Sequence, residues 1–423
     1  MGADLRRFDP NTLTSLTLQN SLFVAKNGND ATGTRNRLDK PFLTITAAQT
    51  AASSGDVIII FPGTYTDTLL QKNGVEYYFY PGAVISAANT IWSMTSDISY
   101  TVSGYGEFIS TSSVVNIAPT TAGTFNLTCR RMQNSSTFST ITLRKCTAYV
   151  TILEDVTQTG NGPGITFGAA GDTALALSVY VNVSKLNTVR TAVQMTGGAT
   201  AKYFLNIDEI NVSSAGAVAG IFALNVIGAG YAELRGKINY DSSASTGAAI
   251  QVNNNVAATI ATVNIYSELK MISGTKAFTI ADSLGGTLCT MYGKISGTGR
   301  ISVTTAGTGK MTFKNDIDLS FSNGAIASVL DFVSGHCEIA CRIKQSSTVI
   351  PANDHTITVN GTGLILNDAI LVNVNGIANS IFAMGGDQHV NVYSGYMNVD
   401  VGGAGFVIND VTGTNLILDT DII

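Results

Sequence analysis

Apolar residues recur along the chain at intervals that constrain its fold more than any other feature of the sequence. From residue 108 onward, an apolar residue within a short strand-like stretch returns every 22 to 31 residues, on average about every 26. These positions are Phe108, Met132, Val156, Leu186, Ile210, Ile238, Leu269, Ile295, Ile317, Ile343, Ile370, Met397 and Ile422. A period of this length on short strands is typical of solenoids, propellers and repeat arrays. Propeller blades need about 40 residues, so we expect a parallel β-helix whose coils each add about 4.8 Å to a rod.

The residue before each apolar position carries a charge in ten successive repeats, and its sign alternates at every step. The ten residues are Glu107, Arg131, Asp155, Lys185, Glu209, Lys237, Glu268, Lys294, Asp316 and Arg342. Only 13% of the chain is charged, so chance does not account for this arrangement. Equivalent positions of a parallel stack lie above one another, where opposite charges attract. We therefore predict a charge ladder on the outside of the rod that helps to fix the register of the coils.

The composition excludes several classes of protein. The 423 residues include 24 Lys or Arg and 29 Asp or Glu, for a net charge of -5. A disordered chain has more charge and fewer β-branched and aromatic residues, and a nucleic-acid binder usually has a basic excess. Helical bundles are rich in Glu, Lys, Ala and Leu rather than in Thr, Ser, Asn, Gly and Val. We therefore expect an all-β protein with no nucleic-acid partner.

The N-terminal part of the sequence has an order of its own. The pattern predicts a strand at 22–25, a turn-rich stretch at 27–30, a helix at 42–53 after Pro41, an apolar strand at 57–61 and a turn at 62–64. The order resembles the opening of right-handed parallel β-helix proteins, the pectate-lyase-like superfamily, which includes enzymes, bacteriophage tailspikes and surface proteins. The residues that carry the resemblance are Phe23-Val24-Ala25, Asn27-Gly28-Asn29-Asp30, Pro41-Phe42-Leu43-Thr44-Ile45, Ala47-Ala48, Gly55-Asp56-Val57-Ile58 and Pro62-Gly63-Thr64-Tyr65.

The resemblance implies that the helix covers the open end of the first coil. We accordingly divide the chain into an N-terminal arm (1–21), an N-terminal cap with the first coil (22–66) and a parallel β-helix (67–423).

Candidate catalytic residues do not form a convincing site. Polygalacturonase-like glycosidases of this fold use paired Asp residues, a Gly-His-Gly and an Arg-Ile-Lys. The chain has Gly335-His336 and Arg342-Ile343-Lys344, but Cys337 follows the histidine and no Asp-Asp pair occurs. Asp316 and Asp318 alternate along one strand, and we interpret them as a ladder residue and its solvated neighbour. The three His and five Cys show no metal-ligand spacing. We predict no catalytic residue, metal or cofactor.

Two groups of residues are candidates for contact with a glycan or a partner. Arg130, Arg144 and Lys145 are basic residues that fall within one or two coils, and the alternative is a solvated turn cluster. Trp92, Tyr100 and Tyr105 belong to an aromatic concentration in the N-terminal coils, and the alternative is a role in the core.

The ends of the sequence lead to expectations about location and assembly. Residues 1–20 have no apolar core of a signal peptide, and the longest apolar run, 57–61, is too short to span a membrane. We expect synthesis in a host cytoplasm without a leader and no membrane insertion. A last coil begins at residue 415 and stops at Ile423 without a cap, which favours association. We expect a homotrimer of parallel rods, with other virion proteins bound at the N-terminal arm or the uncapped end.

These features favour a structural protein of a bacteriophage virion: a β-helical tail fibre, tailspike or capsid-attached fibre that contacts host surface polysaccharide and has no evident catalytic site. One alternative is a polysaccharide lyase or glycoside hydrolase with its active site in a groove or between subunits. Another is a secreted surface adhesin, whose location would be extracellular.

Overall fold

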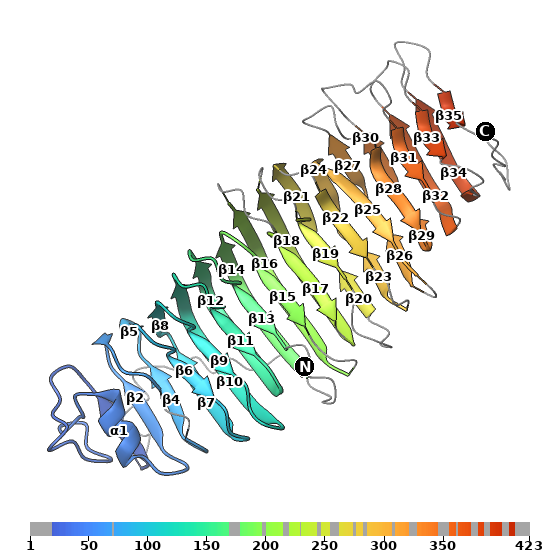
Figure 1. Cartoon of the computed structure of the whole chain (residues 1–423). Coiled ribbons are helices and arrows are strands. Elements are labelled where there is room, and N and C mark those ends of the chain that lie inside the picture. The colour runs from blue at the N-terminus through green and yellow to red at the C-terminus, as the bar shows by residue number, and fades with distance from the viewer. Residues whose placement is uncertain are drawn as a thin grey trace.

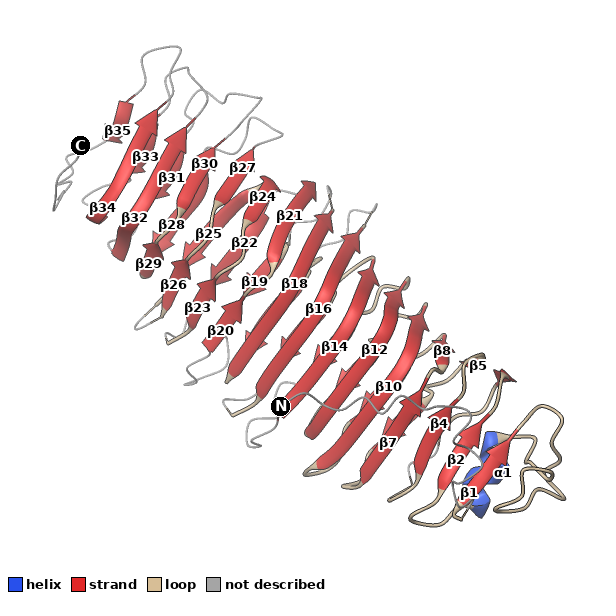
Figure 2. Cartoon of the chain, turned by 180° about the vertical axis from the view of Figure 1, so that it is seen from behind, coloured by secondary structure: helices blue, strands red, loops and turns tan. Residues whose placement is uncertain are grey.

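The protein is a parallel β-solenoid in the computed structural model, and the predicted all-β fold with coils of about 26 residues is confirmed (Figure 1). The structure describes residues 19–69, 72–168, 178–196, 200–214, 220–228, 230–242, 247–253, 262–273, 276–281, 286–306, 309–320, 328–345, 355–360, 363–373, 380–384, 390–399 and 406–410. Figure 2 shows the same rod from behind, with strands stacked side by side from α1 to β35. No helix in these ranges has both the length and the apolar character to cross a membrane.

The described strands form two sheets with 22 and 13 members, here called sheet A and sheet B. Sheet A contains β1 (Ser21–Val24), β2 (Val57–Ile60), β3 (Gly63–Tyr65), β4 (Glu76–Phe79), β5 (Ala83–Ala87), β7 (Ser99–Gly104), β8 (Glu107–Ser110), β10 (Gly123–Asn134), β12 (Cys146–Gln158), β14 (Ser178–Thr188), β16 (Lys202–Ser213), β18 (Tyr231–Asp241), β20 (Thr262–Ile265), β21 (Glu268–Ser273), β23 (Leu288–Met291), β24 (Ile295–Thr298), β26 (Lys310–Phe313), β27 (Ile317–Ser320), β29 (His336–Ile339), β30 (Arg342–Gln345), β32 (Gly363–Asn373) and β34 (Val390–Val399).

Sheet B contains β6 (Trp92–Met94), β9 (Val115–Ile117), β11 (Ile141–Leu143), β13 (Ile165–Phe167), β15 (Val193–Thr196), β17 (Leu224–Gly228), β19 (Ile250–Val252), β22 (Lys276–Ala281), β25 (Arg300–Thr304), β28 (Ser328–Ser334), β31 (His355–Val359), β33 (Ser380–Met384) and β35 (Phe406–Asp410). Thirteen stacked strands at about 4.8 Å each make this sheet about 60 Å long.

From β4 onward, each coil contributes two segments to sheet A and one to sheet B. In the middle of the rod the two sheet A segments join into one long bent strand, so β10 pairs with both β7 and β8, and β18 with both β20 and β21. The bend lies at an irregularity in the register, between Cys129 and Arg131 in β10. The charge-ladder position is therefore the first residue after the bend of each coil.

The interior of the rod is a stack of aligned apolar side chains. Strand residues alternate between the inside and the outside, and Leu127, Val150, Val181, Leu205 and Leu234 occupy one inward position of five successive coils, at most 2% exposed. Burial of one such side chain contributes about 1.5–3 kcal/mol. All five cysteines are also buried and unpaired, so they act as small apolar residues.

The predicted repeat positions pair directly from Phe108 to Ile343. The next prediction was wrong by one residue: Leu371, not Ile370, pairs with Ile343. β32 holds one more residue between its pairings with Ile339 and Arg342 than the coil before it, which shifts the register. Ile422, the last predicted position, lies outside the described residues.

The predicted N-terminal helix is present but shorter than expected. Helix α1 spans Ile45–Ala51 instead of 42–53, and the Thr44 hydroxyl accepts a hydrogen bond from the Ala47 N–H at 3.2 Å. Such a bond satisfies one of the free donors of a helix start. Ile45 and Ala48 are fully buried. Its covering of the first coil stays a prediction, as do the three domain boundaries.

A loop closes the free edge of β1. The Asn36 N–H donates to the Ser21 carbonyl at 2.8 Å, and the Ser21 N–H donates to Asn36 Oδ1 at 2.9 Å. The Phe42 N–H donates to the Phe23 carbonyl at 2.8 Å, and the Ala25 N–H donates to the Phe42 carbonyl at 2.9 Å. An edge strand whose backbone groups are paired in this way no longer offers a template to another strand. The loop therefore blocks extension of the sheet at this end.

We predict that Phe108→Ala lowers the free energy of unfolding by about 3–5 kcal/mol. Phe108 is fully buried, and its ring centroid lies 4.1 Å from that of Trp92 and 5.0 Å from that of Phe79. Urea unfolding followed by circular dichroism measures the change. The control is Tyr105→Ala, since Tyr105 is 47% exposed, and this variant should keep the wild-type midpoint. Equal midpoints for both variants would contradict the packing described above.

Candidate functional site

The ten charged ladder residues lie at one register position of successive coils. The pairs run from Glu107 to Arg131, Arg131 to Asp155, Asp155 to Lys185, Lys185 to Glu209, Glu209 to Lys237 and Lys237 to Glu268. Glu268, Lys294, Asp316 and Arg342 each precede an apolar residue that pairs with the next one, from Leu269 to Ile343. Opposite charges therefore follow one another along the rod over ten coils.

Three steps of the ladder are closed by direct ion pairs in the described structure. The distances are 2.6 Å from Arg131 Nε to Asp155 Oδ1, 3.5 Å from Lys185 Nζ to Glu209 Oε2 and 2.6 Å from Arg342 to Asp316 Oδ2. Each pair is partly exposed to solvent, so it contributes at most about 1 kcal/mol. The larger effect of the ladder is on the register between coils. If one strand shifts by one residue relative to its neighbour, the opposite charges no longer lie beside each other.

Arg130, a predicted contact residue, lies at the bend of β10 and joins three coils. Its guanidinium lies 2.8 Å from Glu107 on the coil before and 2.8 Å from Glu154 on the coil after. Arg131 also reaches Glu154, at 3.3 Å. Two arginines and three carboxylates thus form one network, in which Arg130 already has partners within its own chain. Arg144 and Lys145 lie half-exposed between β11 and β12, and each takes part in further interactions.

Trp92 and Tyr100 have the core role that the sequence left open for them, and neither is a surface contact. Trp92 is 1% exposed and Tyr100 is 3% exposed, because both project into the apolar interior. The Tyr100 ring stacks on Phe125 with centroids 6.1 Å apart, and burial raises the pKa of its hydroxyl well above the usual value. Tyr105 is on the surface, in the turn between β7 and β8.

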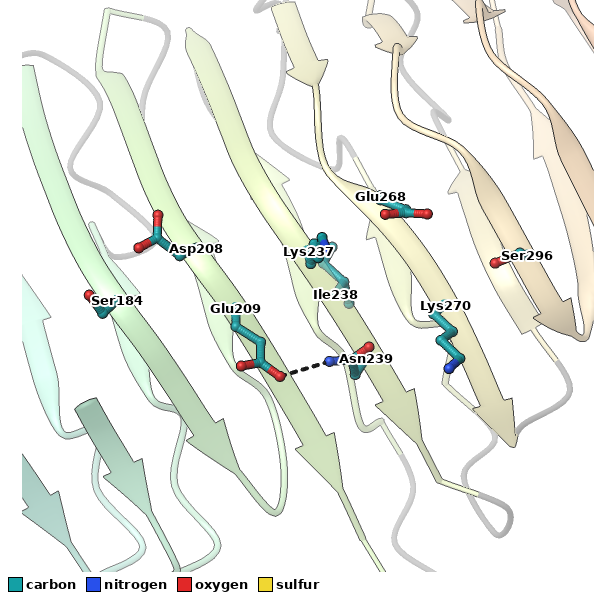
Figure 3. Close-up of a pocket in the computed structure, with 9 residues that line it drawn as sticks. All are labelled: Ser184, Asp208, Glu209, Lys237, Ile238, Asn239, Glu268, Lys270 and Ser296. Carbon is teal, nitrogen blue, oxygen red and sulfur yellow. Dashed lines mark hydrogen bonds between the residues drawn. The ribbon is translucent and has the colours of Figure 1, made fainter. Parts of the chain in front are cut away.

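A shallow groove of about 680 Å³ crosses the outside of β14, β16, β18, β21 and β24 (Figure 3). Its lining residues are Ser184, Asp208, Glu209, Lys237, Ile238, Asn239, Glu268, Lys270 and Ser296. The carboxylates of Asp208, Glu209 and Glu268 share it with two lysines, and the Asn239 amide donates to Glu209 at 3.1 Å. Among the described residues, no three His, Cys, Asp or Glu side chains are grouped so that they could hold a metal ion.

Asparagines form a second ladder beside the groove. The Asn239 amide donates to Asn211 at 2.9 Å, and the Asn211 amide donates to Asn187 at 3.1 Å. Each of these hydrogen bonds thus joins the side-chain amides of asparagines on two neighbouring coils.

The two Asp residues considered for hydrolysis both face basic groups. Asp316 pairs with Arg342, and Asp318 lies 3.9 Å from Lys344 Nζ.

Exposed aromatic side chains form a surface that the sequence reading missed. The rings of Tyr149 and Tyr180 stack with centroids 5.1 Å apart, and those of Tyr180 and Phe204 with centroids 4.8 Å apart. Farther along the rod, Tyr266 and Tyr292 stack with centroids 4.5 Å apart. The signal was present in the sequence, because Tyr180 and Phe204 each lie six residues before a repeat position. Aligning the repeats outward from those positions would have shown the column.

Glu338 is the centre of a smaller cluster on β29. Lys310 Nζ lies 2.5 Å from Glu338 Oε2, Lys314 Nζ lies 3.8 Å from Oε1, and the Asn367 amide donates to Oε1 at 3.3 Å. The hydrogen bond from Lys310 is the main cause that lowers the pKa of Glu338 below its ordinary value of 4.5.

Comparisons with protein-family models, with curated proteins and with solved structures found no match. The fold and its surface therefore define the class, a parallel β-solenoid rod with polar and aromatic ladders on its outside.

We predict that Arg131→Met lowers the free energy of unfolding by up to about 1 kcal/mol in low salt. The substitution leaves Asp155 and Glu154 without one of their cationic partners. The loss should shrink in 1 M NaCl, where charges are screened over about 3 Å. Denaturant titrations at both salt concentrations measure it. Arg37→Met, which removes a pair confined to one exposed loop, is the control and should leave the midpoint unchanged. A salt-independent loss for Arg131→Met would argue against the ladder.

Glu338 should make the protein less stable in acid. Its pKa is lower in the folded than in the unfolded chain, so its contribution is present above about pH 4.5 and is lost as the pH falls through the folded value. Glu338→Gln should therefore cost about 1–2 kcal/mol at pH 7 and flatten the dependence below pH 4.5. Thermal unfolding between pH 3 and 7 tests this, with exposed Glu76→Gln as control. An unchanged slope in Glu338→Gln would refute it.

Proposed function

We propose that the protein is the rigid shaft of a fibre-like structural component of a bacteriophage particle, such as a tail fibre, a tailspike or a capsid-attached fibre. The observation that carries the proposal is the alignment of one position in every coil, at which the outward charges from Glu107 to Arg342 alternate in sign over ten coils. The N-terminal resemblance to right-handed parallel β-helix proteins brings bacteriophage tailspikes into consideration, as members of a superfamily that also includes enzymes and surface proteins.

The arrangement suits a mechanical role. Backbone hydrogen bonds between coils run along the rod, and the ion pairs and asparagine amides act in the same direction. A force that bends or slips one coil must therefore break several interactions with both neighbours at once. Each described strand in the middle of the rod pairs with a strand of the coil before and a strand of the coil after, so a load on one coil passes to both neighbours.

The groove favours one other function, action on a polysaccharide. Asp208, Glu209 and Glu268 are the carboxylates that line it. Hydrolysis of glycosides needs two carboxylic groups in different protonation states. Glu209, Lys237 and Glu268 are ladder residues of alternating sign, so two of the three carboxylates already belong to the charge ladder and do not form a separate catalytic pair. The shaft is therefore the proposal that the surface supports better.

The proposal predicts rods at least about 60 Å long in electron micrographs of the purified protein. Gold-labelled antibodies raised against the chain should bind the tail or capsid of particles from the host that carries the gene. Failure to label any particle would contradict the virion role. In a parallel screen against capsular and cell-wall polysaccharides, we expect no released product. Released product would instead indicate an enzyme with its active site in the groove, if Asp208→Asn or Glu268→Gln abolishes the release and Asp318→Asn does not.

A further inference from the structure

The outward face of the first sheet A segment carries one aromatic side chain in each of six consecutive coils. In coil order they are Tyr149, Tyr180, Phe204, Tyr231, Tyr266 and Tyr292, on or directly after β12, β14, β16, β18, β20 and β23. Four of the six are large exposed side chains, between 36% and 50% exposed. We call this surface the aromatic face. A patch of this kind on a soluble protein usually marks an interaction site.

The contacts within the aromatic face are continuous. Stacking joins Tyr149, Tyr180 and Phe204, and the ring of Tyr231 lies 5.4 Å from that of Phe204. The Tyr231 hydroxyl donates to Glu233 at 2.8 Å, and Arg235 Nε donates to the same carboxylate at 2.7 Å. The Arg235 guanidinium then lies 4.3 Å over the ring of Tyr266, which stacks on Tyr292. The side chains therefore hold one another in fixed positions before any partner binds.

Two sets of equivalent outward positions, two residues apart on each strand, run along this face as neighbouring columns. At one end of the face the aromatic residues are in the first column, and at the other end they are in the second. In β12, β14 and β16 the first column holds the aromatic residue and the second holds a small polar one: Tyr149 with Thr151, Tyr180 with Asn182 and Phe204 with Asn206. In the later coils the order is reversed: Asn264 precedes Tyr266 and Thr290 precedes Tyr292. In β18, between these ends, the two positions are Glu233 and Arg235. Every row thus has one large and one small member, or one acid and one base.

This pattern is complementary to itself. A two-fold axis parallel to the rod, running between the two columns, places the first column of one copy over the second column of the other. In all five aromatic rows a ring then meets a small polar residue, and in the β18 row Glu233 meets the partner's Arg235. In the β16 row the same operation sets Lys202, two residues before Phe204, against the partner's Asp208, two residues after Asn206. Both of these residues are exposed. These contacts match opposite charges.

The rings suit a protein partner better than a sugar. Because they stack on one another along the rod, their faces are covered by neighbouring rings and their edges point outward. Ring edges carry partial positive charge and attract oxygens, such as those of the partner's Asn182 and Asn206. A sugar stacks on a free ring face. Six coils by four outward positions cover about 750 Å², close to the roughly 800 Å² that each partner buries in a stable interface.

We propose that the aromatic face is the interface of a two-fold, parallel pair of rods, formed with a second copy of this chain and centred on Glu233 and Arg235. The inference goes beyond the proposed shaft function and does not depend on it, since the pairing can be measured on the purified protein alone. It also differs from the trimer expected from the sequence.

A charge-swap cycle tests the centre of the interface. The wild type should sediment at micromolar concentration with twice the mass of the 44.1-kDa chain. Glu233→Arg and Arg235→Glu each place like charges against the partner and should weaken the dimer about tenfold or more. The double variant restores both the contact within the chain and the contact between copies, so it should dimerise within about threefold of the wild type. Tyr180→Asp should weaken the dimer, and the control Tyr105→Asp, outside the face, should not.

Cross-linking tests the direction of the two rods. A short thiol-reactive cross-linker should join a copy that carries Tyr180→Cys to a copy that carries Asn182→Cys, because the two-fold axis places these positions opposite each other. The native cysteines are buried and should not react. An antiparallel pair would instead join Tyr180→Cys to Thr290→Cys. That cross-link would overturn the proposal. A monomeric or trimeric state that the charge-swap variants leave unchanged would also overturn it. So would a polysaccharide that binds the monomeric wild type and no longer binds Tyr180→Asp.

Discussion

The parallel pairing of one coil on the next is the interaction on which the rest of this structure depends. Because every coil repeats the hydrogen-bonding direction of the one before, a side chain meets its equivalent about 4.8 Å away. Whatever the sequence places at one register position is therefore repeated as a column. Inside the rod the columns are apolar, as with Leu127, Val150 and Val181, and they remove side chains from water in coil after coil.

Repetition has a cost on the outside, since identical charges would repel along the whole column. The chain avoids this in three ways that can be seen in single residues. The ladder alternates sign, as in Arg131 and Asp155 at 2.6 Å. The asparagine column uses an amide that both donates and accepts, so that Asn211 satisfies its neighbours on both sides. The aromatic column replaces charge by stacking, as in Tyr180 and Phe204. With these devices a surface poor in charge still holds its register.

Much of the fold could be predicted because residues that stack on successive coils of a solenoid are separated by one repeat length in the sequence. The spacing from Phe108 to Ile343 gave the coil length and the stacking partners. The prediction failed where the period is locally broken, at Ile370, since an extra residue in β32 cannot be distinguished from a longer turn by spacing alone. It left Trp92 and Tyr100 undecided between the core and the surface, because a tyrosine or tryptophan in a short strand fits either face until its neighbours are known.

The sequence by itself determined the class of fold, the coil length and the order of the charge ladder, because these follow from one-dimensional periodicity and from the alternation of strand side chains. Tertiary structure alone decided where each coil bends and how the columns on either side of the bend are offset from one another. Those choices set the surface: the bend brings Arg130 between Glu107 and Glu154, and the lateral offset of the columns places Glu233 and Arg235 between two sets of aromatic rings. The physical reason is that Arg130 contacts residues 23 and 24 positions away on neighbouring coils, and Arg235 likewise lies over Tyr266 on the next coil. The lateral alignment of such contacts depends on the path of the chain between them.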